Sequence, residues 1–454
     1  MSIVQAKEVP MELHAVNILY DVAIVAVLLF VSKIIRVKIP LLQKLYIPSA
    51  LIAGFLGLFL GSQFLNILPF SSEIGNYPGI LIAVLFGSMY IGTQKKTSFK
   101  TMLGSAGDAF FVNGAAEILQ WGFFILLGVT VLPVLFSGIN QAFGLMLPSG
   151  FVGGHGTAAA VGSVLAESGW EDAASIGQTF ATVGLLGGIL IGVVLINIGA
   201  RKGWTKVIKG VNELPEEMLT GLVPANKESS MGRSTTNGVS IDSLTWHVSL
   251  VLVAVGMAYL LNMGLKVILP DISFPTYGLA LLCGIVVQAV LRLFKLDHSV
   301  DKQVITHIGS TATDFLVAFG VASIKVSVVL QYWVPILVLA LIAFVVIVGW
   351  FLIISPRFFR NYWFEHGIYV MGMSMGVLAT GVILLRITDP EFKTGALEDF
   401  GLAWIFLSIV DAFLVALSPM FVVSGQGVIY AIVLVIISIA LLILCKLNLK
   451  LTKE

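Results

Sequence analysis

The sequence predicts an all-α polytopic membrane protein, on the basis of its composition, its long apolar segments and two glycine-rich interruptions between them. The chain has 454 residues, of which 58% are hydrophobic and 11% are charged, and its mean hydropathy is +1.00. Soluble domains carry about 25% charged residues, so this chain lacks the charges to cover a water-exposed surface. The net charge of +1 gives no basis for a nucleic-acid partner, and two cysteines, Cys283 and Cys445, give none for a disulfide framework.

Apolar windows of about 17–25 residues are long enough for a helix to cross a bilayer. Five such windows precede a polar segment at 201–243, and six follow it, so we expect about 11 transmembrane helices. Residues 226–238 within the polar segment are expected to be disordered. The windows lie at 16–35, 47–68, 76–93, 107–136, 173–200, 245–268, 274–294, 304–323, 327–355, 398–418 and 425–446.

The basic residues predict the orientation of these spans. If the amino terminus lies outside, 23 of the 26 lysines and arginines fall in cytoplasmic segments. An excess of Lys and Arg marks the cytoplasmic side of a membrane protein. Residues 201–243 are therefore expected to form a cytoplasmic linker, and the carboxyl terminus is expected to be cytoplasmic. Residues 1–16 are polar and show no signal peptide.

Five spans in each half is an odd number, so the second half is expected to be inverted relative to the first. Residues 1–200 would form the first five-helix repeat and residues 244–418 the second. Residues 419–454 would add one C-terminal helix. Between the fourth and fifth span of each half lies a segment rich in glycine, and we expect these segments to be re-entrant hairpins, at 142–168 and 362–388.

Paired, interrupted apolar segments of this kind indicate the binding site of a transporter. A broken helix leaves free N–H groups at a helix start, which suit an anion such as a carboxylate. The alternative is close helix packing through small residues. The candidate substrate-binding residues are Ser149, Gly153, Gly154, His155, Gly156 and Thr157 in the first segment, and Gly372, Ser374, Gly376 and Thr380 in the second.

Polar side chains within the spans are candidates for binding a coupling cation, because burying them in the membrane is costly. Asp411 lies three residues after Ser408, so both face one side of a helix. Glu117 shares a helical face with Asn113 and Gln120, and the alternative role of all these groups is hydrogen bonding between helices. The candidate Na⁺ ligands are Gln120, Thr179, Asp314, Ser408 and Asp411. No constellation of catalytic residues indicates an enzyme.

The first glycine-rich segment resembles a known family. Residues 153–160, Gly-Gly-His-Gly-Thr-Ala-Ala-Ala, resemble the first signature of the sodium/glutamate symporter family. Residues 46–54, Tyr-Ile-Pro-Ser-Ala-Leu-Ile-Ala-Gly, resemble the entry to its second span, and Gln120 matches a glutamine of its fourth span. The second signature departs from the family, because Ser374-Met375 replaces a Thr-Pro.

The resemblance implies two inverted repeats, a homodimer in an inner membrane of bacterial type, and an elevator-type import of glutamate driven by Na⁺ as the coupling ion. A related anionic amino acid or dicarboxylate would suit the same site, and no organic cofactor is implied. A proton-coupled carboxylate transporter is the nearest alternative, for which His155 and Asp314 would be needed. A channel, or a membrane enzyme or sensor using 201–243 as its output, is less compatible with polar segments paired within one chain.

Overall fold

The computed structural model describes residues 15–44, 47–93, 99–207, 220–225, 228–268, 276–389 and 393–451. Every regular element in these ranges is a helix. The first half holds α1 (Ala15–Lys38), α2 (Pro40–Lys44), α3 (Ser49–Leu60), α4 (Tyr77–Ser88), α5 (Phe99–Thr130), α6 (Leu132–Leu135), α7 (Met146–Phe151), α8 (Gly154–Glu167) and α9 (Ala173–Lys202). The second half holds α11 (Ser243–Ile268), α12 (Thr276–Leu293), α13 (Lys302–Ala322), α14 (Val326–Gln331), α15 (Trp333–Ile353), α16 (Ser355–Phe358), α17 (Trp363–Thr388), α18 (Ala396–Val423) and α19 (Gly427–Leu451).

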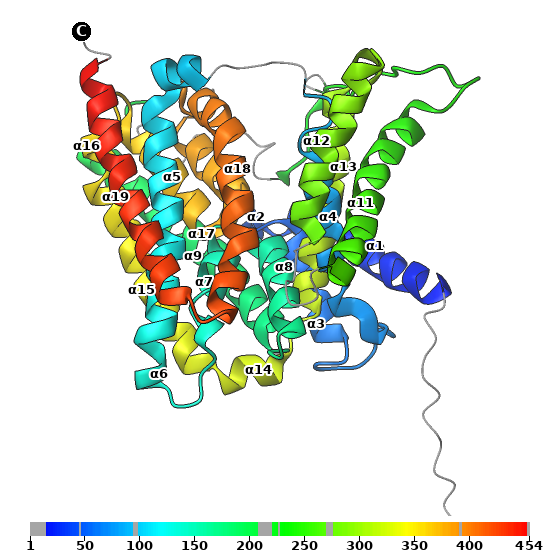
Figure 1. Ribbon diagram of the computed structural model, residues 1–454, viewed down its shortest axis with the longest axis horizontal. Coiled ribbons are helices and arrows are strands. Elements are labelled where there is room, and N and C mark those ends of the chain that lie inside the picture. The colour runs from blue at the N-terminus through cyan, green and yellow to red at the C-terminus, as the bar shows by residue number, and fades with distance from the viewer. Residues whose placement is uncertain are drawn as a thin grey trace, which may run out of the picture.

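The helices form two bodies that lie side by side (Figure 1). The first body consists of α1, α3, α4, α11, α12 and α13, and so combines the first three spans of each half. The second body consists of α5, α7, α8, α9, α15, α17, α18 and α19. Helix α8 reaches across, because it packs on α9 of the second body and on α4 and α13 of the first.

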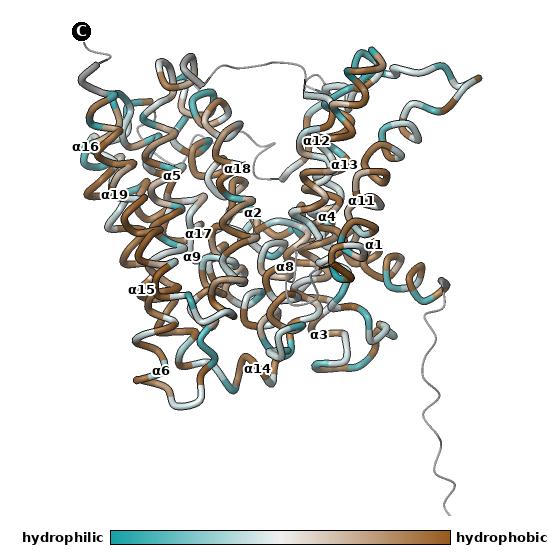
Figure 2. Tube along the Cα trace, in the orientation of Figure 1, coloured by the Kyte–Doolittle hydropathy of each residue, from teal (hydrophilic) through white to brown (hydrophobic). Residues whose placement is uncertain are grey.

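Ten helices among the described residues are long and apolar enough to cross a membrane. Apolar residues predominate along their length, and polar residues gather at their ends and in the loops (Figure 2). Large apolar side chains such as Phe30, Leu260 and Val345 are exposed on the outer surfaces of α1, α11 and α15. A lipid environment accommodates such a surface, whereas water would not, so the chain is a membrane protein.

The prediction of full spans at 47–68 and 76–93 is wrong in their length. The helices there, α3 and α4, have 12 residues each, and 12 residues rise only about 18 Å, short of the roughly 30 Å hydrocarbon core. Helix α4 can end early because carbonyl groups that follow its last residue are bound by the side chain of Lys302. Nζ of Lys302 donates to the carbonyl oxygens of Met89 at 2.5 Å and Ile91 at 3.0 Å, so backbone that leaves the helix is covered by protein.

The linker was expected to be disordered at 226–238, and this is wrong for residues 228–238. The amide of Gln303 donates to the carbonyl of Ser230 at 2.7 Å, and the N–H of Arg233 donates to Asp301 at 3.1 Å. Desolvation raises the pKa of Asp301, but backbone N–H donors, including that of Arg233, more than offset it and hold this pKa below its usual value. The linker is thereby tied to the start of α13.

Helix α17 is a folded-back pair of helical arms, which we call hairpin 2. Its backbone leaves helical geometry at Gly376 and Val377. In a continuous helix Gly372 and Gly381 would lie about 13.5 Å apart. Here a Cβ placed on Gly372 would come within 2.8 Å of Cα of Gly381, so the two arms pack against each other through these glycines.

Helices α7 and α8 form a corresponding pair, which we call hairpin 1. The break between them contains Gly153 and Gly154. Met146 at the start of α7 and Ala158 in α8 both lie against Gly177 of α9, at 2.5 and 2.9 Å from a Cβ placed there. Two residues twelve apart can meet one glycine only if the chain turns back between them.

We predict that Gly381→Ala destabilises the protein by about 1–3 kcal/mol, the usual cost of overpacking. The added methyl group would lie 2.7 Å from the carbonyl oxygen of Tyr369 on the opposite arm, so the arms must separate. Thermal unfolding in detergent, followed by tryptophan fluorescence, measures the effect. The matched control is Gly349→Ala in α15, where a new methyl group meets nothing within 4 Å. Equal stability of the two variants would contradict the packing of hairpin 2.

Candidate substrate and cation site

The tips of the two hairpins touch. A methyl group on Gly154 at the tip of hairpin 1 would collide with Cγ1 of Val377 at the tip of hairpin 2. Both residues have a positive φ, 70° for Gly154 and 62° for Val377. A β-branched residue is a conformational outlier there, and such strain persists only where the surroundings impose it. The two segments singled out in the sequence therefore meet in space at their most constrained residues.

The tip of hairpin 1 is held by polar side chains of α9. The amide of Gln178 donates from Nε2 to the carbonyl oxygen of His155 at 2.9 Å. Nε2 of His155 lies 3.1 Å from the hydroxyl of Thr182, which in turn donates to its own helix at the carbonyl of Gln178. His155 and Gln178 are buried. The imidazole of His155 thus contacts Thr182, and the backbone carbonyl of His155 is held by Gln178.

Hairpin 2 lies along α9 because glycines on that helix leave room for it. The carbonyl oxygen of Met375 would collide with a methyl group on Gly184, and Cβ of Met375 lies 2.9 Å from the corresponding position on Gly188. Further along, Leu384 lies 2.5 Å from the same position on Gly192. Small residues at this spacing let membrane helices approach closely. We call this row of α9 glycines, Gly177, Gly184, Gly188, Gly192 and Gly199, the glycine seam.

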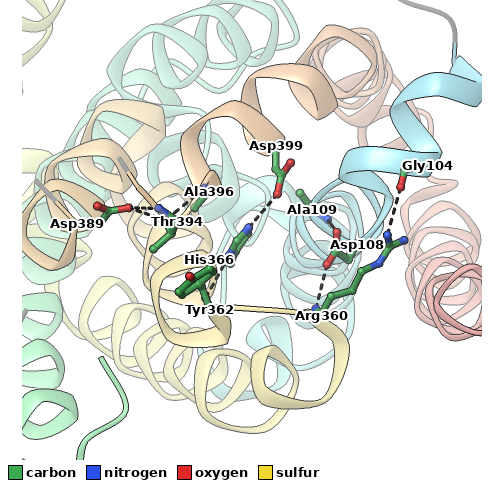
Figure 3. A network of polar contacts seen from close by, with 10 residues as sticks. All are labelled: Gly104, Asp108, Ala109, Arg360, Tyr362, His366, Asp389, Thr394, Ala396 and Asp399. Atoms are coloured by element: carbon green, nitrogen blue, oxygen red, sulfur yellow. Dashed lines mark hydrogen bonds and ion pairs between the residues drawn. The ribbon is translucent and has the colours of Figure 1, made fainter. Parts of the chain in front are cut away.

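The base of hairpin 2 is fixed by a separate polar network (Figure 3). The ring nitrogens of His366 lie 3.1 Å from the carbonyl oxygen of Tyr362 and 3.2 Å from the carboxylate of Asp399 on α18. Asp389 accepts hydrogen bonds from the backbone and hydroxyl of Thr394 at 2.8 and 2.6 Å. These bonds connect the beginning and the end of the hairpin to the start of α18, away from the tip.

The same network ties the segment before hairpin 2 to α5. The backbone N–H of Arg360 donates to the carboxylate of Asp108 at 3.0 Å, and its guanidinium donates to the carbonyl oxygen of Gly104 at 3.2 Å (Figure 3). Both acceptors belong to the first turns of α5. The hairpin therefore has a fixed base and a tip held mainly by packing.

Beside the first arm of hairpin 2, α5 and α18 bring together a cluster of carboxyl and amide groups. Nε2 of Gln120 donates to the carbonyl oxygen of Ser374 at 3.0 Å, while its Oε1 has no hydrogen-bond partner. Both carboxyl oxygens of Glu117, which is 2% exposed, also lack one by distance and angle. The carboxyl group of Asp411 on α18 lies beside that of Glu117, close enough for a hydrogen bond between the two when one is protonated. Carboxylate and amide oxygens are the ligands that a hard cation prefers.

Asp411 also faces the first body. Its carboxyl group lies near Tyr277 of α12, and one turn earlier the hydroxyl of Ser408 lies 2.8 Å from that of Tyr90. Tyr277 donates to the carbonyl oxygen of Val415 at 3.0 Å. The acidic pair is therefore located where α18 of the second body meets α12 and the end of α4.

The other predicted site residues are placed as follows. Gly156 faces the first body, since a methyl group there would meet Ile82 of α4 and, at 3.1 Å, Leu316 of α13. The hydroxyl of Ser149 donates within its own helix at 2.8 Å, as does that of Thr179 at 2.7 Å. Thr157 is buried in hairpin 1, and Thr380 donates its hydroxyl to the carbonyl of Gly376, closing the turn of hairpin 2.

Asp314 and Thr179 are not gathered with the other candidate cation ligands. Asp314 is exposed on α13 of the first body. The hydroxyl of Thr179 is directed to the carbonyl of Ser175 in α9. Gln120, Glu117 and Asp411 are brought together instead, with Ser408 one turn away on α18.

The model of one family, the sodium/glutamate symporter, matches residues 14–363 of the chain. The chain belongs to the sodium/glutamate symporter family. No curated protein matches the chain in a direct search. The family is one of transporters and not of enzymes.

The match to the sodium/glutamate symporter family covers hairpin 1, α9 and the whole first body. It ends at Trp363, where hairpin 2 begins. The second signature and Asp411 lie beyond that point. Their relation to hairpin 1 and to Glu117 therefore rests on the structure alone.

The sequence did not identify two features of the site, the role of Glu117 and the glycine seam. Glu117 was noted on a polar face of its helix but not ranked among the cation ligands, because its partner lies 294 positions later in the chain, at Asp411. The glycine seam was not recognised. A signal for it exists, since Gly184, Gly188 and Gly192 recur every four residues, the spacing of small residues at membrane helix contacts.

We predict that Gly154→Ala abolishes most transport by this symporter while the protein still inserts. The new methyl group would collide with Val377 and would also sit at a φ of 70°. Uptake of labelled substrate and protein abundance are measured together. Gly169→Ala is the matched control, because Gly169 has a φ of 95° but open space around it.

The double variant Gly154→Ala/Val377→Gly distinguishes the steric collision between the two tips from the backbone strain of an alanine at a φ of 70°. It removes the Val377 side chain, so part of the lost transport should return. Normal transport by Gly154→Ala alone would show that the contact between the tips has no role.

Proposed function

We propose that this protein is a sodium-coupled secondary active transporter that imports glutamate, or a closely related anionic amino acid or dicarboxylate. Membership of the sodium/glutamate symporter family supports the class of substrate and the coupling ion. The observation that carries the proposal is the contact between the tips of hairpins 1 and 2. A substrate held there touches segments from both halves of the chain, as alternating access requires.

The chemistry of the tips suits an anion. Helix α8 starts at Gly154, and the second arm of hairpin 2 starts just after Val377. The first N–H groups of a helix have no partner within it, and the helix dipole places partial positive charge there. The substrate carboxylates would be received by these two helix starts, with Gly153, Gly156 and Ser374 keeping the backbone accessible.

Inverted repeats and an elevator-type movement fit the packing of the first body. Helix α3 packs on α13 as α4 packs on α12, and α1 packs on α3 as α11 packs on α12. If α1, α3 and α4 of the first half correspond to α11, α12 and α13 of the second half, each of these contacts has its counterpart under that correspondence. We propose that hairpins 1 and 2 are re-entrant, that the second body carries the substrate, and that the first body is the scaffold of a homodimer.

Na⁺ would bind between α5 and α18. The carboxylates of Glu117 and Asp411 and Oε1 of Gln120 would supply the oxygen ligands. Glu117 and Gln120 belong to α5 and Asp411 to α18. Gln120 connects the two sites, because its Nε2 already holds the carbonyl of Ser374. A cation bound by its Oε1 would fix that amide and, through it, the first arm of hairpin 2.

Proton coupling is the second candidate, and the pair of carboxyl groups is what favours it. Two neighbouring carboxyl groups, with Glu117 buried and Asp411 half-buried, are unfavourable when both are charged without a cation, so they share either a proton or a metal ion. The family membership favours Na⁺.

The proposal predicts glutamate uptake by liposomes containing the purified protein when an inward Na⁺ gradient is imposed. Uptake should fall to background when K⁺ replaces Na⁺ on both sides, since no driving force remains. A panel of labelled amino acids and dicarboxylates, tested with Na⁺ and pH gradients separately, gives the substrate and the ion. Uptake driven by a pH gradient without Na⁺ would establish the proton-coupled alternative, and no uptake of any anion would reject the proposal.

For the cation site, Glu117→Gln and Asp411→Asn should each lower the apparent Na⁺ affinity of uptake by tenfold or more. Losing one charged contact costs about 1.5–3 kcal/mol, which exceeds the 1.4 kcal/mol of a tenfold change. Asp314→Asn is the matched control, because Asp314 is exposed on α13. Loss of Na⁺ affinity in Asp314→Asn, with the other two variants unaffected, would place the site on α13 instead.

A further inference from the structure

A cavity of about 470 Å³ lies between the two bodies at the base of hairpin 1. It is bordered by the start of α4, the outer half of α8, the start of α9 and the segment 323–325 after α13. The end of α9 and the start of α13 adjoin the linker at 201–243. The cavity lies at the other ends of these two helices, on the side of the protein opposite the linker, and we call it the outer cavity. Its volume is in the range of small-molecule sites.

Two helix starts converge on the outer cavity. Asn76 and Gly79 line it at the start of α4, and Glu171 and Ala174 line it at the start of α9. The residues before these helices, Asn76 and Asp172, make no side-chain capping bond. Two helix starts without a side-chain cap place partial positive charge on one cavity, which favours an anion.

A buried polar side chain borders the cavity. Gln178 lines it and is 3% exposed, and its Oε1 has no hydrogen-bond partner. Its Nε2 holds the carbonyl of His155 at the tip of hairpin 1. On the opposite side, a Cβ on Gly320 of α13 would lie 2.6 Å from Oε1 of Gln178. The amide of Gln178 therefore lies at the boundary between the two bodies, with an unused acceptor.

Charges of both signs are arranged around the mouth of the cavity. Lys325 lines it and is exposed, and its backbone N–H is fixed to Ser175 at 3.2 Å. Glu171 is exposed on the same cavity. Glu167 is already paired with Lys266 of α11 at 3.3 Å. A ligand with a carboxylate and an ammonium group thus finds Lys325 with two helix starts for the first, and Glu171 with the Gln178 acceptor for the second.

We propose that the outer cavity is a reception site that binds an α-amino acid carrying an additional carboxylate before it reaches the hairpin tips. The inference rests on the proposed transport function, and it adds Lys325, Glu171 and Gln178 as residues that recognise the substrate. Gln178 links the two sites, because the amide that borders the cavity also fixes the backbone of His155.

The first test is the KM for L-glutamate in proteoliposomes. Lys325→Ala should raise this KM roughly tenfold, the effect of losing one charge-assisted contact, with kcat within about twofold because the hairpin tips are unchanged. Lys325→Arg keeps the charge and should stay near the parent value. Lys206→Ala, which removes an exposed charge at the opposite end of the protein, is the control. An unchanged KM in Lys325→Ala would overturn the proposal.

The second test measures binding without transport. Ser163 and Ser323 both line the cavity, and the native cysteines Cys283 and Cys445 are buried. Ser163→Cys and Ser323→Cys in detergent should react with a hydrophilic thiol reagent, and L-glutamate with Na⁺ should slow the reaction several-fold.

Protection of the introduced cysteines by L-glutamate tests the outer cavity independently of the proposed transport function. Uptake by the cysteine variants without any protection by L-glutamate would reject the outer cavity and leave transport intact. Protection without uptake by the parent protein would support the cavity and reject transport. The use of two cysteine positions guards against one substitution that prevents folding.

Discussion

The arrangement of the whole second body depends on the close approach of two hairpins to one helix, α9. Gly177 accepts hairpin 1, and Gly184, Gly188 and Gly192 accept hairpin 2. In lipid there is little hydrophobic force between helices, so packing at short range is the main source of their association. Side chains at the glycine seam would push both hairpins outward and separate their tips. The contact between Gly154 and Val377 thus depends on the absence of side chains at the glycine seam of α9.

The polar groups of the second body are distributed in a way that matches this packing. Hydrogen bonds are concentrated at the base of hairpin 2, where Asp389 and His366 join it to α18. At the tip the backbone carries strain at Val377 and few polar contacts. A firmly anchored base with a strained tip is an arrangement in which a ligand can stabilise one tip conformation by binding it.

Two glutamines connect the hairpins to the groups that would recognise ions and substrate. Gln120 holds the carbonyl of Ser374 in hairpin 2, and its Oε1 has no hydrogen-bond partner. Gln178 holds the carbonyl of His155 in hairpin 1 and borders the outer cavity, and its Oε1 likewise has no hydrogen-bond partner. Each amide uses its donor for the hairpin, and under the proposed function its acceptor would bind a cation or an ammonium group. Binding at either acceptor would then be coupled to the position of a hairpin backbone.

The sequence by itself determined the class of the protein, the family and the location of both interrupted segments. Composition and span length suffice for these because lipid demands long apolar helices and penalises backbone that leaves them. The family signature at residues 153–160 was local and needed no tertiary information. The tertiary structure decided which distant residues come together: that the short helix in 76–93 is followed by backbone bound to Lys302 of α13, that Glu117 lies beside Asp411, and that Asp314 lies apart on α13. These depend on pairs of residues hundreds of positions apart, and hydropathy along the chain carries no information on such pairs.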